Sequence, residues 1–339
     1  MLITIWFMLW ALLWAVYFML DGFDLGAGAL LPVAAKNARE RAIVHNAIGP
    51  FWDGNEVWLI AAGGVTFAAF PLTFGVMFSG LYSAFMLLLF TLILRGAALG
   101  LRGETESQAG KRAWDLVLTA TSILAPLLFG AAFANIFHGL PLDREHPPQG
   151  AILPLLNPYA IIGAALFLAF AMEHGMIWLA VKTGGEVQAR ARQWAKSVWI
   201  ALALIAVAFD IFTAFATNIW QGYLHRPYLF IIPLVNLIAL VMARVFMAKE
   251  KWLRAFAASC VFIVSGTFFG LAGIYPAMVP SSLDPEFTVT AAMAASSPLT
   301  LKIMLGVVLV LVPIIIAYQT WVYVLFKGKA EDNEYGYGE

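Results

Sequence analysis

The sequence predicts an all-α integral membrane protein with about nine transmembrane helices, forming a single membrane domain over residues 1–339. Hydrophobic residues make up 62% of the chain and charged residues only 12%, whereas soluble domains carry roughly a quarter charged residues. The charges gather in short patches between long uncharged runs. Because a helix needs about 20 apolar residues to cross the hydrocarbon core, each run is interpreted as one crossing.

The uncharged runs define the individual helices. Residues 1–20 carry no charge and lack the basic start of a cleaved signal peptide, so a retained helix is expected there. The run from Val57 to Leu94 is long enough for two crossings, with Pro71 and Gly75 marking a tight turn between them. Six further runs complete the set: residues 114–137, 158–181, 197–218, 227–246, 253–277 and 301–326.

The cations are distributed unevenly between the two sides of the predicted membrane domain. If the helices alternate in direction, 17 of the 20 Lys and Arg residues fall on one side, and only Arg144, Arg226 and Lys302 fall on the other. Cytoplasmic loops carry the excess of Lys and Arg in membrane proteins. We therefore expect the N-terminus outside and the C-terminus in the cytoplasm, which requires an odd number of crossings.

The sequence excludes several classes of function. The longest connections are under about 20 residues, too short for a separate catalytic domain. The sequence has no phosphate-binding Gly loop, no Ser/His/Asp arrangement and no nucleic-acid patch, so no nucleic-acid partner is expected. The single cysteine, Cys260, lies in an apolar run and is interpreted as a packing residue.

Four carboxylates near the predicted cytoplasmic ends of the first two helices form the candidate site. Ionisable groups inside membrane segments are costly and usually functional. Asp21 and Asp24 are three residues apart, as are Asp53 and Glu56, so each pair lies on one helix face. Because the first helix runs inward and the second starts inside, the four groups are expected to converge at one depth. Crowded carboxylates in a medium of low dielectric can exchange protons, as a relay requires.

A structural role is the alternative for the same acids. Carboxylates at helix ends also cap helices, remain solvated or pair with loop arginines such as Arg39 or Arg95. The relay is therefore assigned first to Asp24 and Asp53, and then to Asp21 and Glu56.

The histidines bear on whether this chain could hold heme by itself. There are five of them: His45, His138, His146, His174 and His225. Only His174, beside Glu173, lies deep enough in a predicted helix to be a candidate axial ligand, and a buried histidine is more often a hydrogen-bonded structural residue. We expect neither a metal nor a heme to be held by this chain.

Glycine and tryptophan patterns on the first helix predict its packing. Gly22 and Gly26 form a small-xxx-small pair, which favours close approach of a second helix. Trp6, Trp10 and Trp14 recur every four residues. A stripe for electron transfer or quinone stacking is one interpretation, but interface anchoring and packing are favoured.

Three stretches resemble subunit II of the cytochrome bd quinol oxidase family: residues 21–26 (DGFDLG), 52–59 (WDGNEVWL) and 276–282 (PAMVPSS). The resemblance covers nearly the whole chain, including residues 155–158 (LLNP) and 311–315 (LVPII). It implies a terminal respiratory oxidase of the bacterial inner membrane. Such a complex oxidises quinol, reduces dioxygen to water and takes protons from the cytoplasm.

The resemblance also implies an architecture and partners. Two four-helix bundles, residues 1–138 and 157–280, would be followed by a peripheral helix at 299–326. The chain would pack as a pseudo-symmetric heterodimer against subunit I, which holds the b and d hemes and the quinol site. Small accessory subunits, a bound quinone and membrane lipid are further implied partners. The family's proton path would pass through Asp24 and Asp53.

Two other functions stay open at this point. A proton-coupled secondary transporter also combines broken helices with buried carboxylates, although the acids here are expected near the inner surface and the odd helix makes the halves unequal. A purely structural scaffold for a heme subunit would differ from the preferred interpretation only in whether the acids matter. Truncating Asp24 and Asp53 distinguishes these last two.

Overall fold

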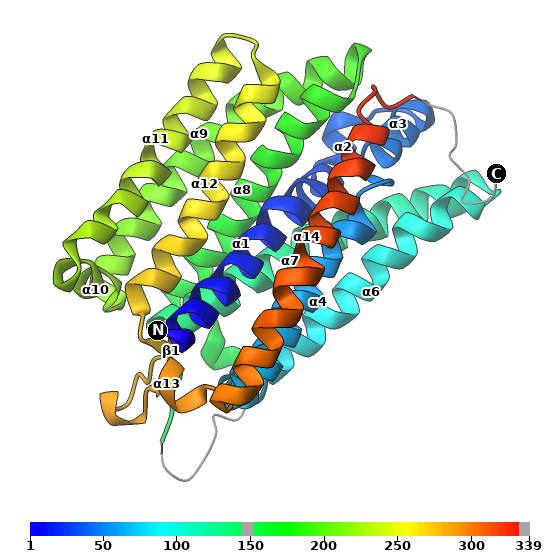
Figure 1. Cartoon of the computed structure of the whole chain (residues 1–339). Coiled ribbons are helices and arrows are strands. Elements are labelled where there is room, and N and C mark those ends of the chain that lie inside the picture. Colours follow the sequence, from blue (N-terminus) through cyan, green and yellow to red (C-terminus); the bar gives the residue numbers. More distant parts are fainter. Residues whose placement is uncertain (144–151, 332–339) are drawn as a thin grey trace.

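The chain is described by a computed structural model that covers residues 1–143 and 152–331 and is almost entirely helical (Figure 1). Arg144 and His146, which the sequence places in a loop, lie outside the described residues. The long helices are α1 (Leu2–Ala29), α4 (Trp52–Ala69), α6 (Tyr82–Glu104), α7 (Gln108–His138), α8 (Pro158–Lys182), α9 (Gly185–Ala216), α11 (Ile231–Ala248), α12 (Trp252–Ile274) and α14 (Pro298–Leu325).

Shorter elements connect the long helices. The short α-helices are α2 (Leu31–Ala34), α3 (Ala38–Ile48), α5 (Pro71–Gly80), α10 (Ile219–His225) and α13 (Ala291–Ala294). The 3-10 helices are η1 (Leu153–Leu155), η2 (Pro227–Phe230) and η3 (Pro285–Phe287). Two short strands, β1 (Ala277–Val279) and β2 (Val289–Thr290), pair in antiparallel fashion after α12.

The number of crossings agrees with the sequence. In the described part of the chain, eight helical segments are long and apolar enough to span a membrane, and the bent pair formed by α4 and α5 brings the total to nine. The prediction of an all-α membrane protein with about nine transmembrane helices is confirmed. Figure 1 shows the long helices side by side, with α2 and α3 at one end of the molecule and β1, α10 and α13 at the other.

The expected hairpin between Val57 and Leu94 differs from the structure at its turn. The chain bends by 117° between α4 and α5, at Pro71, but Gly75 lies inside the helix α5 rather than in a tight turn. Proline ends one helix because it lacks a backbone N–H, and its fixed φ suits the first position of the next helix. A ten-residue helix therefore follows the bend, before α6 begins at Tyr82.

Helix α1 occupies the centre of the fold and contacts α4, α7, α8 and α12. Its closest neighbour is α8: a Cβ atom on Gly26 would lie 1.7 Å from the backbone oxygen of Ala171, and one on Gly175 would lie 2.3 Å from the backbone nitrogen of Ala27. At Gly22 the same test gives only ordinary contacts. The close approach predicted for the first helix is thus made at Gly26, because only a residue without a side chain lets the backbones meet there.

The tryptophans of α1 are packing residues, as favoured from the sequence. Trp6, Trp10 and Trp14 are all buried. The indole N–H of Trp6 donates to the backbone oxygen of Leu301 on α14, and that of Trp10 donates to the hydroxyl of Thr66 on α4. Helix α14 otherwise lies on the outside of the bundle, with Leu301 as its one buried residue in the described chain.

We predict that Gly26→Ala destabilises the protein. The added methyl group would meet the backbone of α8, and overpacking of this kind costs about 1–3 kcal/mol or more. The matched control is Gly100→Ala in α6, where a Cβ meets nothing within 4 Å and alanine is the better helix former by roughly 0.5–1 kcal/mol. Thermal unfolding in detergent would measure both; equal melting temperatures for the two variants would contradict the packing argument.

Candidate functional site

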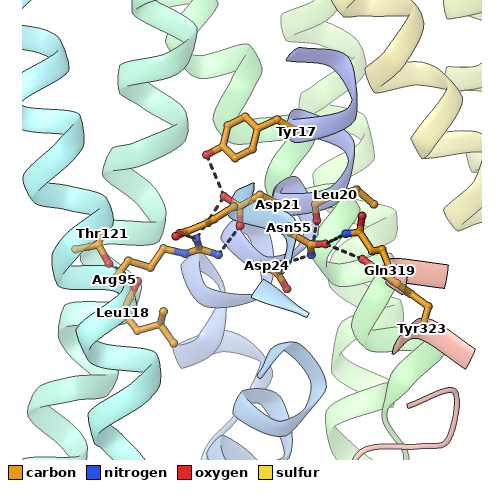
Figure 2. A network of polar contacts seen from close by, with 11 residues as sticks. Tyr17, Leu20, Asp21, Asp24, Asn55, Arg95, Leu118, Thr121, Gln319 and Tyr323 are labelled. Atoms are coloured by element: carbon orange, nitrogen blue, oxygen red, sulfur yellow. Dashed lines mark hydrogen bonds and ion pairs between the residues drawn. The ribbon is translucent and has the colours of Figure 1, made fainter. Parts of the chain in front are cut away.

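A buried arginine lies between two of the predicted acids. The guanidinium of Arg95 on α6 donates to Asp21 on α1 at 2.7 and 3.3 Å and to Glu56 on α4 at 2.5 Å. Asp21 also accepts a hydrogen bond from the hydroxyl of Tyr17 at 3.0 Å. Asp21 and Arg95 are completely buried, and the side chain of Glu56 is 21% exposed. We call Asp21, Glu56 and Arg95 the Arg95 cluster; Figure 2 labels Asp21 and Arg95.

The position of Arg95 corrects the sequence analysis, which treated it as a loop cation. It lies in the interior of α6, which extends to Glu104. A buried charge is tolerated only when it is paired and hydrogen-bonded, and the two carboxylates provide that compensation. The structural alternative of pairing with arginine is therefore the geometry found for Asp21 and Glu56.

Asp24 belongs to a different set of contacts, which runs from α1 to α14 (Figure 2). Its Oδ2 accepts a hydrogen bond of 2.7 Å from the side-chain amide of Asn55 on α4. The amide oxygen of Asn55 accepts in turn from Gln319 at 2.9 Å and from the hydroxyl of Tyr323 at 3.0 Å. We call Asp24, Asn55, Gln319 and Tyr323 the Asp24 network. Its members are held by α1, α4 and α14, so it joins the central helix to the outermost one.

The carboxyl group of Asp24 is only partly satisfied. The residue is completely buried, and its Oδ1 has no hydrogen-bond partner in the described part of the chain. Neither of its oxygens is paired with a cation among the described residues. Asp24 thus differs from Asp21, three residues earlier on the same helix, which has a guanidinium against both of its oxygens.

Asp53 lies apart from these contacts. It is exposed in the first turn of α4, whereas Asn55 of the same turn is buried. Residues two apart on a helix do not share a face, so burying Asn55 directs Asp53 outward. The structure therefore brings Asp21 and Glu56 together, places Asp24 beside them in a separate network, and leaves Asp53 on the surface of this chain.

The sequence analysis did not identify the polar partners of the acids. Asn55 lies inside the stretch 52–59 that carries the resemblance, but it was not given a role. Gln319 is a lone amide in the apolar run 301–326, and an isolated polar side chain in a membrane helix is a recognisable signal for an interhelical hydrogen bond.

His174 is a structural residue in this fold. Its Nε2 contacts the backbone oxygen of Met19 at 3.0 Å and its Nδ1 contacts the hydroxyl of Ser259 at 2.6 Å. The ring also stacks on Phe256 with centroids 4.5 Å apart. Because both ring nitrogens are occupied, the residue does not fit the role of an axial heme ligand. Glu173 beside it is buried, and its Oε1 has no partner among the described residues.

No group of three or more His, Cys, Asp or Glu residues in the described chain is arranged to hold a metal ion.

A family model for cytochrome bd terminal oxidase subunit II matches residues 2–326. The chain belongs to this family. The assignment made from the sequence motifs is confirmed, and the chain is a subunit of an oxidoreductase complex rather than a complete enzyme.

Relatives match the chain over nearly its whole length. The cytochrome bd ubiquinol oxidase subunit 2 of Bacillus subtilis is 32% identical, with 97% of each chain covered. The cytochrome bd-I ubiquinol oxidase subunit 2 of Escherichia coli K12 is 30% identical over 94% of this chain and 92% of its own. A chain of the bd oxidase structure from Geobacillus thermodenitrificans has a TM-score of 0.76 at 15% identity, covering 96% of this chain and 98% of that one, which shows a shared fold.

We predict that Arg95→Gln strongly destabilises the subunit, because it leaves two carboxylates in the interior without a cation. Breaking a buried ion pair on one side costs about 3–5 kcal/mol. The double variant Asp21→Asn/Arg95→Gln should recover part of that loss, since it removes one of the uncompensated charges. Membrane yield and thermal unfolding would measure the effect; a single variant as stable as the wild type would show that the cluster is not needed for the fold.

Proposed function

We propose that this chain is subunit II of a quinol-oxidising, dioxygen-reducing complex of the bacterial cytoplasmic membrane, and that it packs against a heme-bearing subunit I. Family membership and the ubiquinol oxidase relatives support this assignment. The occupied ring nitrogens of His174 support placing the hemes in the partner. Residues 1–138 and 157–280 would form its two four-helix bundles, with α14 as the peripheral helix.

We propose further that the chain supplies part of a proton uptake path from the cytoplasm, with Asp24 as its central group. The observation that carries this proposal is the buried, incompletely bonded carboxyl of Asp24, which has no cation partner among the described residues. A carboxylate held by arginine stays charged, because releasing the ion pair is costly. A carboxyl bonded only to a neutral amide can gain or lose a proton without breaking such a pair, as a relay group must.

The other acids take different roles in this proposal. Asp53, exposed at the start of α4, would collect protons at the chain surface. Glu56 is partly exposed and paired with Arg95, so it would help to hold the guanidinium in place rather than carry protons. Asp21, bonded to Tyr17 and Arg95, would position the guanidinium rather than carry protons.

A purely structural role for the acids is the second candidate, and the Arg95 cluster favours it for Asp21 and Glu56. The two candidates differ at Asp24 and Asp53, which have no arginine partner among the described residues. The transporter alternative loses its basis, since no observation on this chain favours a substrate site over membership of an oxidase family.

We expect Asp24→Asn to lower quinol-dependent oxygen consumption by at least about tenfold while heme content and complex yield stay near wild type, because an amide preserves the shape but cannot exchange the proton. Asp53→Asn should also slow oxygen consumption with normal assembly. Glu106→Gln, at an exposed acid in the connection between α6 and α7 and outside both sets of contacts, is the matched control.

The readouts separate the relay from the scaffold. Reduced-minus-oxidised spectra give the b and d heme content, and an oxygen electrode gives the rate. Loss of heme d together with activity in Asp24→Asn would favour the structural role. Full activity with normal heme content would eliminate Asp24 from the path.

We also expect no stably bound heme when the chain is expressed alone. The only deeply buried histidine in the middle of a described helix, His174, has both nitrogens engaged. An absorption spectrum of the purified single subunit is the measurement. A Soret band that disappears in His174→Phe would overturn this assignment and make His174 a ligand.

A further inference from the structure

A basic cavity lies away from the Arg95 cluster and the Asp24 network, at the end of the molecule where α6 ends and α7 begins. Its volume is about 270 Å³. Five cations and one carboxylate line it: Lys36, Arg41, Arg102, Lys111, Arg112 and Asp115. The first residues of α3 and α7 line it as well, and helix N-termini carry partial positive charge. Among the described lining residues, Lys36, Arg41, Arg102 and Arg112 already outnumber the one carboxylate.

The single carboxylate organises this cavity without neutralising it. Asp115 accepts from Arg102 at 2.6 Å and from Arg41 at 3.1 Å, and it contacts His45 at 2.9 Å. Burial lowers the pKa of His45, so at neutral pH this ring adds no charge. One negative charge thus holds two guanidinium groups at the wall of the cavity, where their mutual repulsion is otherwise unfavourable.

The arginines retain donors for a further acceptor. The Nε of Arg41 is buried and has no hydrogen-bond partner among the described residues. The side chain of Arg102 is 7% exposed, and Asp115 contacts its Nε. Asp115 contacts Nη1 of Arg41 and Nε of Arg102, so each guanidinium at the cavity keeps nitrogens that this carboxylate does not occupy.

We propose that this cavity binds a phosphate group. Arginine presents its N–H donors in a planar fork that matches phosphate, and lysines add point charges around it. The cavity lies where α6 ends and α7 begins, and basic pockets between membrane helices hold the headgroups of anionic phospholipids. The phosphate can come from such a headgroup or from inorganic phosphate in solution, and the chemistry of recognition is the same.

The test uses the complex purified through a tag on this chain and stripped of lipid. Thermal unfolding is followed with dioleoylphosphatidylglycerol, with dioleoylphosphatidylcholine, and with inorganic phosphate against chloride at constant ionic strength. The cavity variant is Lys36→Gln/Arg112→Gln, which spares the contacts of Asp115. The matched control is Lys249→Gln/Arg254→Gln, which removes the same charge at two exposed positions, one directly after α11 and one in the first turn of α12.

We expect the cavity variant to bind phosphatidylglycerol roughly tenfold more weakly than the wild type, because two cations near the phosphate are removed, while the control keeps its affinity. The same loss seen with inorganic phosphate and not with phosphatidylglycerol would assign the site to the solute. If wild type and cavity variant respond equally to both probes, or if the control loses as much as the cavity variant, the proposal is wrong. Arg112→Gln alone, at an exposed position, repeats the test if the double variant assembles poorly.

Discussion

The ion pair between Arg95 and Asp21 is the constraint on which the polar interior of this protein depends. Arg95 is on α6, which is otherwise largely exposed, and Asp21 is on α1, the central helix. Both are completely buried, so neither charge is tolerable without the other. Glu56 adds α4 to the same pair. One guanidinium therefore sets the relative positions of three helices and the depth at which the candidate site is built.

On the same helix α1, Asp24 is an acid without a cation partner among the described residues. Asp24 is three residues after Asp21, yet its partner is the amide of Asn55, which Gln319 and Tyr323 of α14 hold in place. The contrast divides the acids into groups fixed by charge and a group held by neutral hydrogen bonds. Proton transfer requires the second kind, because a charge locked in an ion pair cannot be removed without a large penalty.

Around Asp115, in α7, the ratio of carboxylates to arginines is the reverse of that in the Arg95 cluster. There one carboxylate serves two arginines and a histidine, so positive charge remains in excess. In the interior, two carboxylates serve one arginine and negative charge remains in excess. The two clusters lie about two turns apart on the same α6, since Arg95 is in the interior of that helix and Arg102 is near its end.

Much of the architecture follows from the sequence because hydropathy and charge act locally: an uncharged run of sufficient length becomes a crossing wherever it packs, and the acids at 21, 24, 53 and 56 stand out against it. Their partners do not follow, because Arg95 is 74 positions from Asp21 and Gln319 is 264 from Asn55. The tertiary structure alone decided that Arg95 is a core residue, that the turn after α4 contains a helix, and that Asp53 faces outward. Each of these depends on which helix lies opposite, and that is a property of packing rather than of any single run.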